Sequence, residues 1–322
     1  MFISIILIAL GFVLLIKGAD YLVDGASNIA KKFHIPEIII GLTIISIGTS
    51  MPELFVSITS AIDGHSDMAI GNVIGSNIAN LFLILGLSAI IKSIPFKKET
   101  RLIEIPLCFI MTVIFFIICV LGQDVSRSDS AILIAIFIAF ILYTIVMAKK
   151  GEEFDKEENS EEIKEEEEDK GKLSTLKDIC AVILGIVALK FGGDLAVDNA
   201  VKVATILGLS EKIISVTILA IGTSLPELVT SVSAAAKGKS DIAIGNIIGS
   251  NIFNMLLIIG VSAAIKPIVY NMSYNKDMII LLAGTLVLAL FPVIPPKNKM
   301  SRMNGIVYVL MYLGYMVSLF FV

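Results

Sequence analysis

Apolar runs of about twenty residues, each long enough to cross a hydrocarbon core of roughly 30 Å as a helix, recur from one end of the chain to the other. Hydrophobic residues make up 56% of the 322 positions, and the mean hydropathy is +0.92. A soluble globular domain is markedly less apolar. The first run, Phe2 to Ile16, lacks a basic start and a small-residue cleavage site, which favours a retained span over a signal peptide. The sequence therefore predicts an all-α polytopic membrane protein.

The runs divide into five predicted spans in each half of the chain, ten transmembrane helices in all. They lie near residues 2–25, 36–61, 68–91, 102–121, 129–148, 177–200, 211–236, 241–264, 277–296 and 303–322. Because five is an odd number, the second half enters the membrane from the side opposite to the first. The halves are therefore predicted to be inverted repeats, an arrangement typical of secondary transporters.

An internal duplication accompanies this pattern. Asp20–Lys92 aligns without a gap with Asp194–Lys266 at a constant offset of 174, and 31 of the 52 positions in Gly41–Lys92 are identical in the second copy. A repeat of this kind fixes the organisation of the chain before any local feature is considered. The predicted parts are a first five-helix repeat at 1–148, an acidic linker at 149–176 and a second, inverted five-helix repeat at 177–322.

The linker and the basic residues together predict an orientation. Gly151–Gly171 carries twelve acids and three lysines with little apolar content, which indicates a solvated segment that is disordered or partly helical. With the N-terminus outside, 18 of the 25 basic residues fall in cytoplasmic loops. The positive-inside rule then favours a cell (plasma or inner) membrane protein with both termini outside and a cytoplasmic linker.

Two acidic residues differ from the other 27, which lie in the linker, in loops or towards span ends. Glu53 and Glu227 lie near the centres of their spans, with no lysine or arginine within a helical turn or two. A charge at that depth is costly and by default indicates a functional site with a partner, here a bound cation. Local helical ion pairs are expected instead for Lys17 with Asp20 and for Lys190 with Asp194.

A structural alternative exists for both glutamates. Ser50 and Glu53 in "GTSMPELFVS", like Ser224 and Glu227 in "GTSLPELVTS", match the capping box that satisfies free amides at a helix start. The proline inside each motif suits the first turn of a new helix. Each span is therefore predicted to break at the midplane. Irregular backbone at that depth is tolerated only in buried or cavity-lining positions, so we favour an ion site over a purely structural cap.

The following span in each half carries polar residues at helical spacing, in "GNVIGSNIANLFLILG" and "GNIIGSNIFNMLLIIG". Ser76 and Asn80 are four residues apart and share a helix face, as do Ser250 and Asn254. The alternative is a small-residue packing face with interhelical hydrogen bonds. The neighbouring amides, which face another side and are expected to be structural, are Asn77 and Asn251.

Crossing the two inverted copies is expected to bring Glu53 and Glu227 together. Oxygen ligands without sulfur or imidazole favour a hard cation, and Ca²⁺ accepts roughly six to eight oxygens in flexible mixtures. Two ionised glutamates balance one Ca²⁺, and several Na⁺ ions could compete for the same oxygens. The other side chains expected to contribute oxygens are Thr49, Ser50, Thr223, Ser224, Asn80 and Asn254.

At these motifs the chain resembles the calcium/cation antiporter superfamily, and most closely the prokaryotic sodium/calcium exchangers. The resemblance rests on the alpha-repeats Gly41–Lys92 and Ser215–Lys266, with "GTSMPE", "GTSLPE" and two "GN-x-IGSNI" motifs. It implies electrogenic exchange of one Ca²⁺ for about three Na⁺ by alternating access, with the first and sixth spans sliding. By position it implies Ca²⁺ ligands at Glu53, Glu227, Thr49 and Thr223, and Na⁺ ligands also at Ser50, Ser224, Ser76, Ser250, Asn80 and the carbonyls of Ser46 and Ala220.

Potassium-dependent relatives have an aspartate at the position of Asn254, so this asparagine argues against potassium co-transport. Proton-coupled relatives usually place a glutamate in this span of each half, where this chain has Asn80 and Asn254, and the asparagines favour sodium. A proton- or potassium-coupled calcium antiporter remains the alternative, and a cation channel is the rival from another class. The expected partners are Ca²⁺, Na⁺ and the lipid bilayer. We expect no enzyme activity, no permanent cofactor, no nucleic-acid partner and a monomer.

Overall fold

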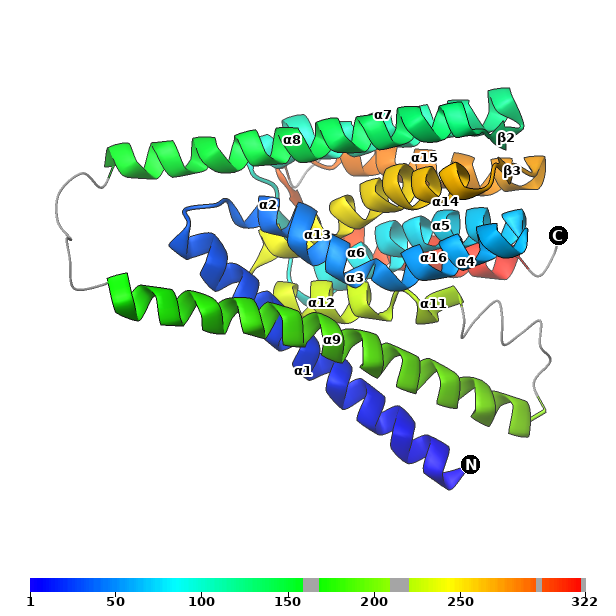
Figure 1. Cartoon of the computed structure of the whole chain (residues 1–322), viewed down its shortest axis with the longest axis horizontal. Helices are drawn as coiled ribbons and strands as arrows, with labels where there is room; N and C mark the ends of the chain where they lie inside the picture. Colours follow the sequence, from blue (N-terminus) through cyan, green and yellow to red (C-terminus); the bar gives the residue numbers. More distant parts are fainter. Residues whose placement is uncertain (159–167, 209–219, 294–296, 320–322) are drawn as a thin grey trace.

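The computed structural model describes residues 1–158, 168–208, 220–293 and 297–319, and it is almost entirely helical (Figure 1). Its α-helices are α1 (Phe2–Lys32), α2 (Glu37–Ile40), α3 (Ser46–Thr49), α4 (Met51–Asp63), α5 (Ser66–Ile78), α6 (Leu85–Ile91), α7 (Ile105–Gly122), α8 (Arg127–Glu158), α9 (Glu168–Ile206), α11 (Ala220–Gly222), α12 (Leu225–Ala236), α13 (Ser240–Phe253), α14 (Ile259–Ile265), α15 (Asn275–Leu290) and α16 (Arg302–Ser318). The π-helical stretches are η1 (Gly41–Ile45), η2 (Ala79–Ile84), η3 (Thr100–Glu104) and η5 (Asn254–Ile258), and η6 (Met272–Tyr274) is a 3₁₀ turn.

Within the described residues, seven helical segments are long and apolar enough to cross a membrane. They are Phe2–Lys32, Ser66–Ile91, Thr100–Gly122, Arg127–Lys149, Thr175–Ile206, Ser240–Ile265 and Met272–Leu290. An eighth results if Glu37–Thr49 and Met51–Asp63, which are bent by 49°, count as one broken span. The chain is therefore an all-helical, multi-span membrane protein.

This count does not confirm the ten predicted spans. The expected span at 211–236 includes residues outside the described part of the chain, which resumes with α11 and α12. The expected span at 303–322 corresponds to α16, which has 17 residues and ends at Ser318. The predicted linker is helical at both ends, because α8 continues to Glu158 and α9 begins at Glu168, while 159–167 lie outside the described residues.

The molecule has two opposite faces. We call the face where α8 ends and α9 begins the linker face, and the face where α1 begins and α16 ends the far face (Figure 1). On the far face β2 (Asp124–Val125) pairs antiparallel with β3 (Ile268–Val269). At the opposite end β1 (Ile94–Pro95) pairs antiparallel with β4 (Lys299–Met300). These short ladders join the two halves of the chain at both faces.

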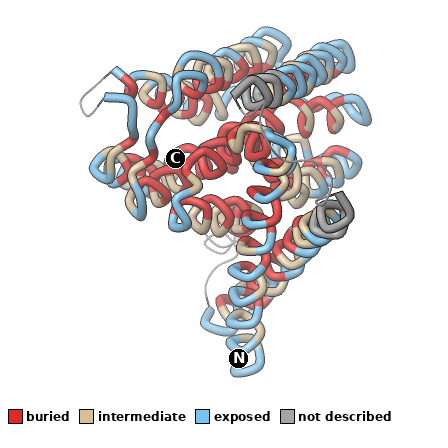
Figure 2. The backbone as a smooth tube through the Cα atoms, turned by 90° about the vertical axis from the view of Figure 1, so that its left-hand side faces the viewer, coloured by how far each residue is buried: buried red, intermediate tan, exposed pale blue. Residues whose placement is uncertain are grey.

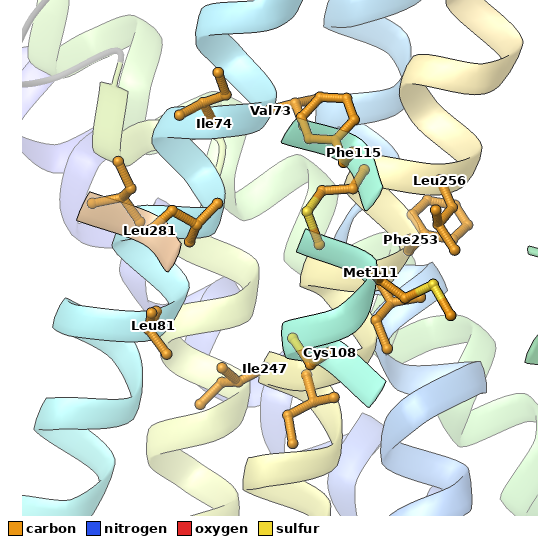
Figure 3. Packing of buried hydrophobic residues seen from close by; sticks show 14 of the residues in the cluster. Val73, Ile74, Leu81, Cys108, Met111, Phe115, Ile247, Phe253, Leu256 and Leu281 are labelled. Atoms are coloured by element: carbon orange, nitrogen blue, oxygen red, sulfur yellow. The ribbon is translucent and has the colours of Figure 1, made fainter. Parts of the chain in front are cut away.

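The segments that carry the repeated "GN-x-IGSNI" motif form the centre of the bundle. Ser240–Ile265 is 94% buried over its apolar stretch and Ser66–Ile91 is 72% buried, against 22–33% for the other five. Buried residues accordingly concentrate in the middle of the molecule (Figure 2). In Figure 3, Ile247 and Phe253 of α13 pack near Cys108 and Met111 of α7. The outer helices instead expose large apolar side chains, as a lipid-facing surface requires.

Helices α1 and α9 form an antiparallel pair joined through glycines. A Cβ added to Gly18 would lie 2.9 Å from the carbonyl oxygen of Gly185, and one added to Gly11 would lie 2.8 Å from that of Gly192. Only glycine allows backbones to approach this closely, as is common between membrane helices. The pair runs obliquely beside the rest of the bundle in Figure 1.

The two local ion pairs expected in these helices have different outcomes. The pair within α9 is confirmed, because Lys190 Nζ lies 2.6 Å from Asp194 Oδ1. The expected pair of Lys17 with Asp20 is wrong, because Asp20 pairs at 2.8 Å with Lys237, which follows α12. The packing of α1 against α12 supplies this nearby cation, so a tertiary partner replaces the local one.

Candidate functional site

Two serines mark the helix breaks of the repeated motif. Ser50 (φ −85°, ψ 9°) separates α3 from α4, and Ser224 (φ −87°, ψ 6°) precedes α12. Pro52 and Pro226 lie in the first turns of the new helices, where a missing N–H leaves no hydrogen bond unmade. The near-identical backbone angles follow from the near-identical sequences of the two motifs.

Neither serine side chain caps its own helix, so the capping-box alternative is wrong for both motifs. Each hydroxyl instead donates to the glutamate of the other half. Ser50 Oγ lies 2.7 Å from Glu227 Oε1, and Ser224 Oγ lies 3.3 Å from Glu53 Oε1. A hydrogen bond to a carboxylate is stronger than one to a neutral amide, which explains why the tertiary acceptor is preferred. The two helix starts therefore face each other.

Glu53 and Glu227 are each 1% exposed. Within the described ranges, no ion pair joins either carboxylate to a lysine, arginine or histidine, and the two carboxylates repel each other. An unpaired buried carboxylate is expensive, and two adjacent ones more so. A cation between them would relieve both penalties.

Four buried carboxylate and amide oxygens of the two repeated segments have no hydrogen-bond partner in the part of the chain that the structure describes. They are Glu53 Oε2, Glu227 Oε2, Asn80 Oδ1 and Asn254 Oδ1. Buried acceptors are normally paired, and these four are two symmetric pairs of the oxygen types that hard cations prefer. The same ranges hold no group of three or more His, Cys, Asp or Glu that could bind a metal, so a cation here would also depend on neutral oxygens.

The asparagines of the two central helices bond across the halves. Asn80 Nδ2 donates to Asn251 Oδ1 at 3.1 Å, and Asn254 Nδ2 donates to Asn77 Oδ1 at 3.0 Å. The amides of Asn77 and Asn251 donate in turn to each other's backbone carbonyls. Two asparagines thus act as supports, as expected, while the other two keep their oxygens free.

Ser76 and Ser250 occupy equivalent positions but bond differently. Ser76 Oγ donates to Glu53 Oε1 at 3.4 Å. Ser250 Oγ is buried and lacks a partner among the residues described. The structure therefore places Ser76 beside its glutamate and leaves the hydroxyl of Ser250 available.

The remaining predicted ligands lie beside the breaks. Thr49 Oγ1 lies 3.3 Å from the carbonyl oxygen of Ser46 and contacts the Glu227 carboxylate. Thr223 contacts the Glu53 carboxylate in the same crossed way. Ala220 is the first residue of α11, and the segment before it, 209–219, is not among the described residues. The structure thus brings both threonines to the opposite glutamates.

Sequence reasoning assigned no role to Asn72 and Asn246, the asparagines of the "GN" dipeptides. Asn72 Nδ2 donates to Ser57 Oγ at 3.0 Å and to the Glu53 carbonyl at 3.2 Å. Asn246 Nδ2 donates to Ser231 Oγ at 2.9 Å. Each asparagine thus braces the half-helix that carries a glutamate. The sequence did contain a pattern from which this role could have been predicted, because the asparagine recurs in both copies together with a serine four residues after each glutamate.

Comparison with known families decides what kind of protein contains this arrangement. The profile of the family described as sodium/calcium exchanger protein matches residues 3–146 and 177–321. The chain belongs to the sodium/calcium exchanger family. Both matched ranges carry one copy of the glutamate motif.

Individual proteins are similar to this chain over most of their length. The chain is 33% identical over 353 residues to the sodium/calcium exchanger MaX1 of Methanosarcina acetivorans, covering 99% of each chain. It is 35% identical over 293 residues to the inner membrane protein YrbG of Escherichia coli (strain K12), covering 90% of this chain and 89% of YrbG. The solved structure of the sodium-calcium exchanger NCX_Mj, soaked with 10 mM Na⁺ and zero Ca²⁺, superimposes with a TM-score of 0.83 at 33% identity over 98% of both chains.

Proposed function

We propose that this family member is a secondary active antiporter that exchanges Ca²⁺ for Na⁺ by alternating access, with net movement of charge. The observation that carries the proposal is the buried pair Glu53 and Glu227, each with one oxygen that lacks a partner in the described structure. Two carboxylates balance the charge of one Ca²⁺. The relatives support this choice, because NCX_Mj has been solved with Na⁺, Ca²⁺ or Sr²⁺.

The calcium position lies between the two helix starts. Glu53 and Glu227 supply the charge, and Thr49 and Thr223 contact the carboxylates from the opposite halves. The N-termini of α4 and α12 hold these groups in place. Flexible mixtures of carboxylate and neutral oxygens suit Ca²⁺ better than Mg²⁺. The mixed ligand set, with only two charges, also permits release, which transport requires.

Sodium ions use the same carboxylates together with neutral oxygens. Because like-charged ions repel and the ligands are shared, simultaneous occupancy by Ca²⁺ and a full set of Na⁺ is unfavourable. Competition of this kind couples the release of one ion to the binding of the other. The neutral oxygens proposed for Na⁺ are those of Ser50, Ser224, Ser76, Ser250, Asn80, Asn254 and the carbonyls of Ser46 and Ala220.

Sodium is the proposed coupling ion because the central helices carry amides rather than extra acids. Asn80 Oδ1 and Asn254 Oδ1 are buried acceptors without a partner in the described ranges. A neutral amide oxygen can bind Na⁺ but cannot carry a proton at this position, as a carboxylate would. Proton coupling is therefore the less favoured alternative.

We propose the ten-span, inverted-repeat arrangement for the whole chain, with repeats at 1–148 and 177–322 and a linker at 149–176. The start of α1 and the end of α16 lie on the face opposite the end of α8 and the start of α9 (Figure 1), as two five-span halves require. The excess of basic residues on the linker side supports a cytoplasmic linker and outside termini in the cell membrane.

The test is uptake of radioactive calcium into proteoliposomes loaded with Na⁺, with K⁺ or with a proton gradient. Wild-type protein is expected to take up Ca²⁺ only with internal Na⁺, and valinomycin with K⁺ is expected to change the rate by setting a potential. Glu53→Gln and Glu227→Gln should abolish uptake. Glu99→Gln, at an exposed glutamate just before η3, is the matched control and should retain it.

Each rival function has its own outcome. Uptake driven only by a proton gradient would establish proton coupling instead. Calcium flux that needs no counter-ion would identify a channel. Full activity of either glutamine variant at position 53 or 227 would remove that residue from the site.

A further inference from the structure

A cluster of charges on the linker face ties α1 to the end of α12. Lys237 Nζ lies 2.8 Å from Asp20 Oδ1 and 2.9 Å from Asp24 Oδ2, and Lys239 Nζ lies 2.9 Å from Asp24 Oδ1. Ser233 Oγ also donates to Asp20 Oδ1 at 3.1 Å. Two lysines are thereby shared between two carboxylates one helical turn apart on α1.

These pairs form a connected network at a partly buried position. The lysine side chains are 28% and 21% exposed. Burial alone would lower the pKa of Lys237, yet the hydrogen bonds from its ammonium to Asp20 and Asp24 raise it above its ordinary value. Isolated surface pairs contribute little, whereas networks with shared partners contribute more. The network therefore favours the charged, bonded arrangement.

An apolar layer lies beneath this network. Leu22 and Ala26 of α1 are fully buried in one cluster with Ala234 and Ala235 of α12 and Ile242 of α13. The linker face is thus closed here by close packing, with the ion pairs at its surface.

The symmetry-related positions on the far face carry different charges. At the constant offset of 174, the two aspartates of α1 correspond to Asp194 and Asp198 of α9, and the two lysines correspond to Asp63 and His65. Three acids and a histidine cannot reproduce the network. Asp194 instead pairs within its own helix, and no ion pair joins α9 to the α4–α5 turn within the residues that the structure describes.

The packing around the two helix breaks also differs from what the inverted symmetry would give. A Cβ added to Gly48 would lie 2.7 Å from Ile186, and one added to Gly222 would lie 2.7 Å from Val197, so both breaks abut α9. Under the inverted symmetry these contacts would map onto α1, at Phe12 and Val23. The α1–α9 pair therefore lies displaced to one side of the symmetric arrangement.

We infer that Asp20, Asp24, Lys237 and Lys239 form a latch that holds α1 over the linker face in the observed state and biases the protein towards it. The inference rests on the proposed alternating access. In the symmetry-related state α9 would cover the far face, where no equivalent latch exists. The latch must break each time the site opens to the linker face, so it acts on the conformational step and not on ion binding.

The test is a distance measurement between spin labels in the full chain reconstituted in nanodiscs. Labels at Lys31→Cys and Lys297→Cys report on the linker face, and labels at Lys202→Cys and Lys276→Cys report on the far face. All four positions are exposed, and of the three native cysteines only Cys180 is exposed and needs replacement by serine.

Asp20→Asn/Asp24→Asn is expected to lengthen the linker-face distance and shorten the far-face distance. The ratio of the two populations should change roughly tenfold, which corresponds to about 1.4 kcal/mol. Asp194→Asn/Asp198→Asn, the matched change on α9, should leave the ratio near that of the wild type. Unchanged distances in the first variant would overturn the latch.

A second variant tests the inference without weakening any existing contact. Asp63→Lys/His65→Lys places lysines on the far face at exposed positions, where the inverted symmetry would bring them to Asp194 and Asp198 in the symmetry-related state. It should shift the populations the other way, by about threefold because Lys190 competes for Asp194. Wild-type proteoliposomes that fail to exchange Na⁺ for Ca²⁺ would contradict the proposed function, whereas normal exchange with no shift in either variant would contradict only the latch.

Discussion

The two glutamates of the site have equivalent sequences around them but different hydrogen bonds. Glu227 Oε1 accepts one short bond, from Ser50 at 2.7 Å. Glu53 Oε1 accepts two longer ones, from Ser224 at 3.3 Å and Ser76 at 3.4 Å. The backbone angles at the two breaks agree within a few degrees, so local sequence is not the cause. The duplication sets which oxygens are present, and the tertiary packing around them sets how they bond.

The largest expected effect comes from removing either charge. Glu53→Gln and Glu227→Gln should each weaken Ca²⁺ binding by about 30-fold or more, because losing one partner of a buried charge pair costs about 2–5 kcal/mol. Isothermal titration with Ca²⁺ in detergent measures this directly. The two losses should agree within tenfold if both halves contribute equally to the ion. A loss confined to one variant would show that the unequal hydrogen bonds reflect unequal roles.

Replacing either asparagine that donates across the halves, Asn254 or Asn80, by aspartate should lower the free energy of unfolding of the protein. Asn254→Asp cannot donate to Asn77 once deprotonated, which leaves a buried acceptor unpaired at a cost of about 1–3 kcal/mol. The protonated form can donate, so stability is retained at low pH and falls as pH rises through the titration of the introduced carboxyl. Asn80→Asp is the matched change on the other half.

Thermal unfolding in detergent between pH 5 and 8 measures this effect. Both variants should unfold several degrees earlier at pH 8 than at pH 5, relative to the wild type. A loss of stability that does not depend on pH, or that affects only one variant, would contradict the crossed asparagine bonds at 3.0 and 3.1 Å.

The sequence predicted the features that depend on residue identity. The repeated motifs and the constant offset predicted the break at Ser50, and the 49° bend confirms it. The hydropathy pattern predicted a multi-span helical protein, although the count of ten was not confirmed. The family resemblance is confirmed by the match over 3–146 and 177–321.

Other features could not be predicted, because two copies with the same sequence have the same local preferences. The capping-box interpretation failed at Ser50 since its hydroxyl has a stronger acceptor, Glu227, 177 residues away. The pairing of Asp20 with Lys237 likewise depends on where α1 lies against α12. The role of Asn72 and Asn246 was within reach, because both recur in the duplicated motif.

Substitution of the equivalent serines, Ser76 and Ser250, should reveal a smaller difference in stability between the two halves. Ser76→Ala removes a hydrogen bond to Glu53, whereas Ser250→Ala removes a hydroxyl that has no partner in the described structure. A hydrogen bond contributes about 0.5–1.5 kcal/mol, so Ser76→Ala should lower the thermal midpoint by a few degrees and Ser250→Ala should not. Both should raise the Na⁺ concentration for half-maximal exchange, measured by calcium efflux. Equal midpoints would show that the two serines bond alike.

The smallest expected effect concerns the ends of α4 and α12. Lys266 Nζ would lie 2.8 Å from a Cβ at Gly64, and Lys92 Nζ would lie 2.6 Å from one at Gly238, so each lysine lies at the C-terminus of the other half's helix. A cation there contributes about 0.3–1 kcal/mol through the helix dipole. Lys92→Met and Lys266→Met should each lower the midpoint by about 1–3 °C. A clear difference between them would show that the two faces are not equally packed.

The glycine contacts between α1 and α9 have a thermodynamic consequence. Gly18 meets Gly185 and Gly11 meets Gly192, and the offset of 174 maps each of these contacts onto the other. A pair with this property has the same internal contacts in either of two states related by the inverted symmetry. The internal energy of the α1–α9 pair is then the same in both states and does not contribute to the free-energy difference between them. Enlarging these glycines would weaken the folded protein without changing the direction in which it prefers to open.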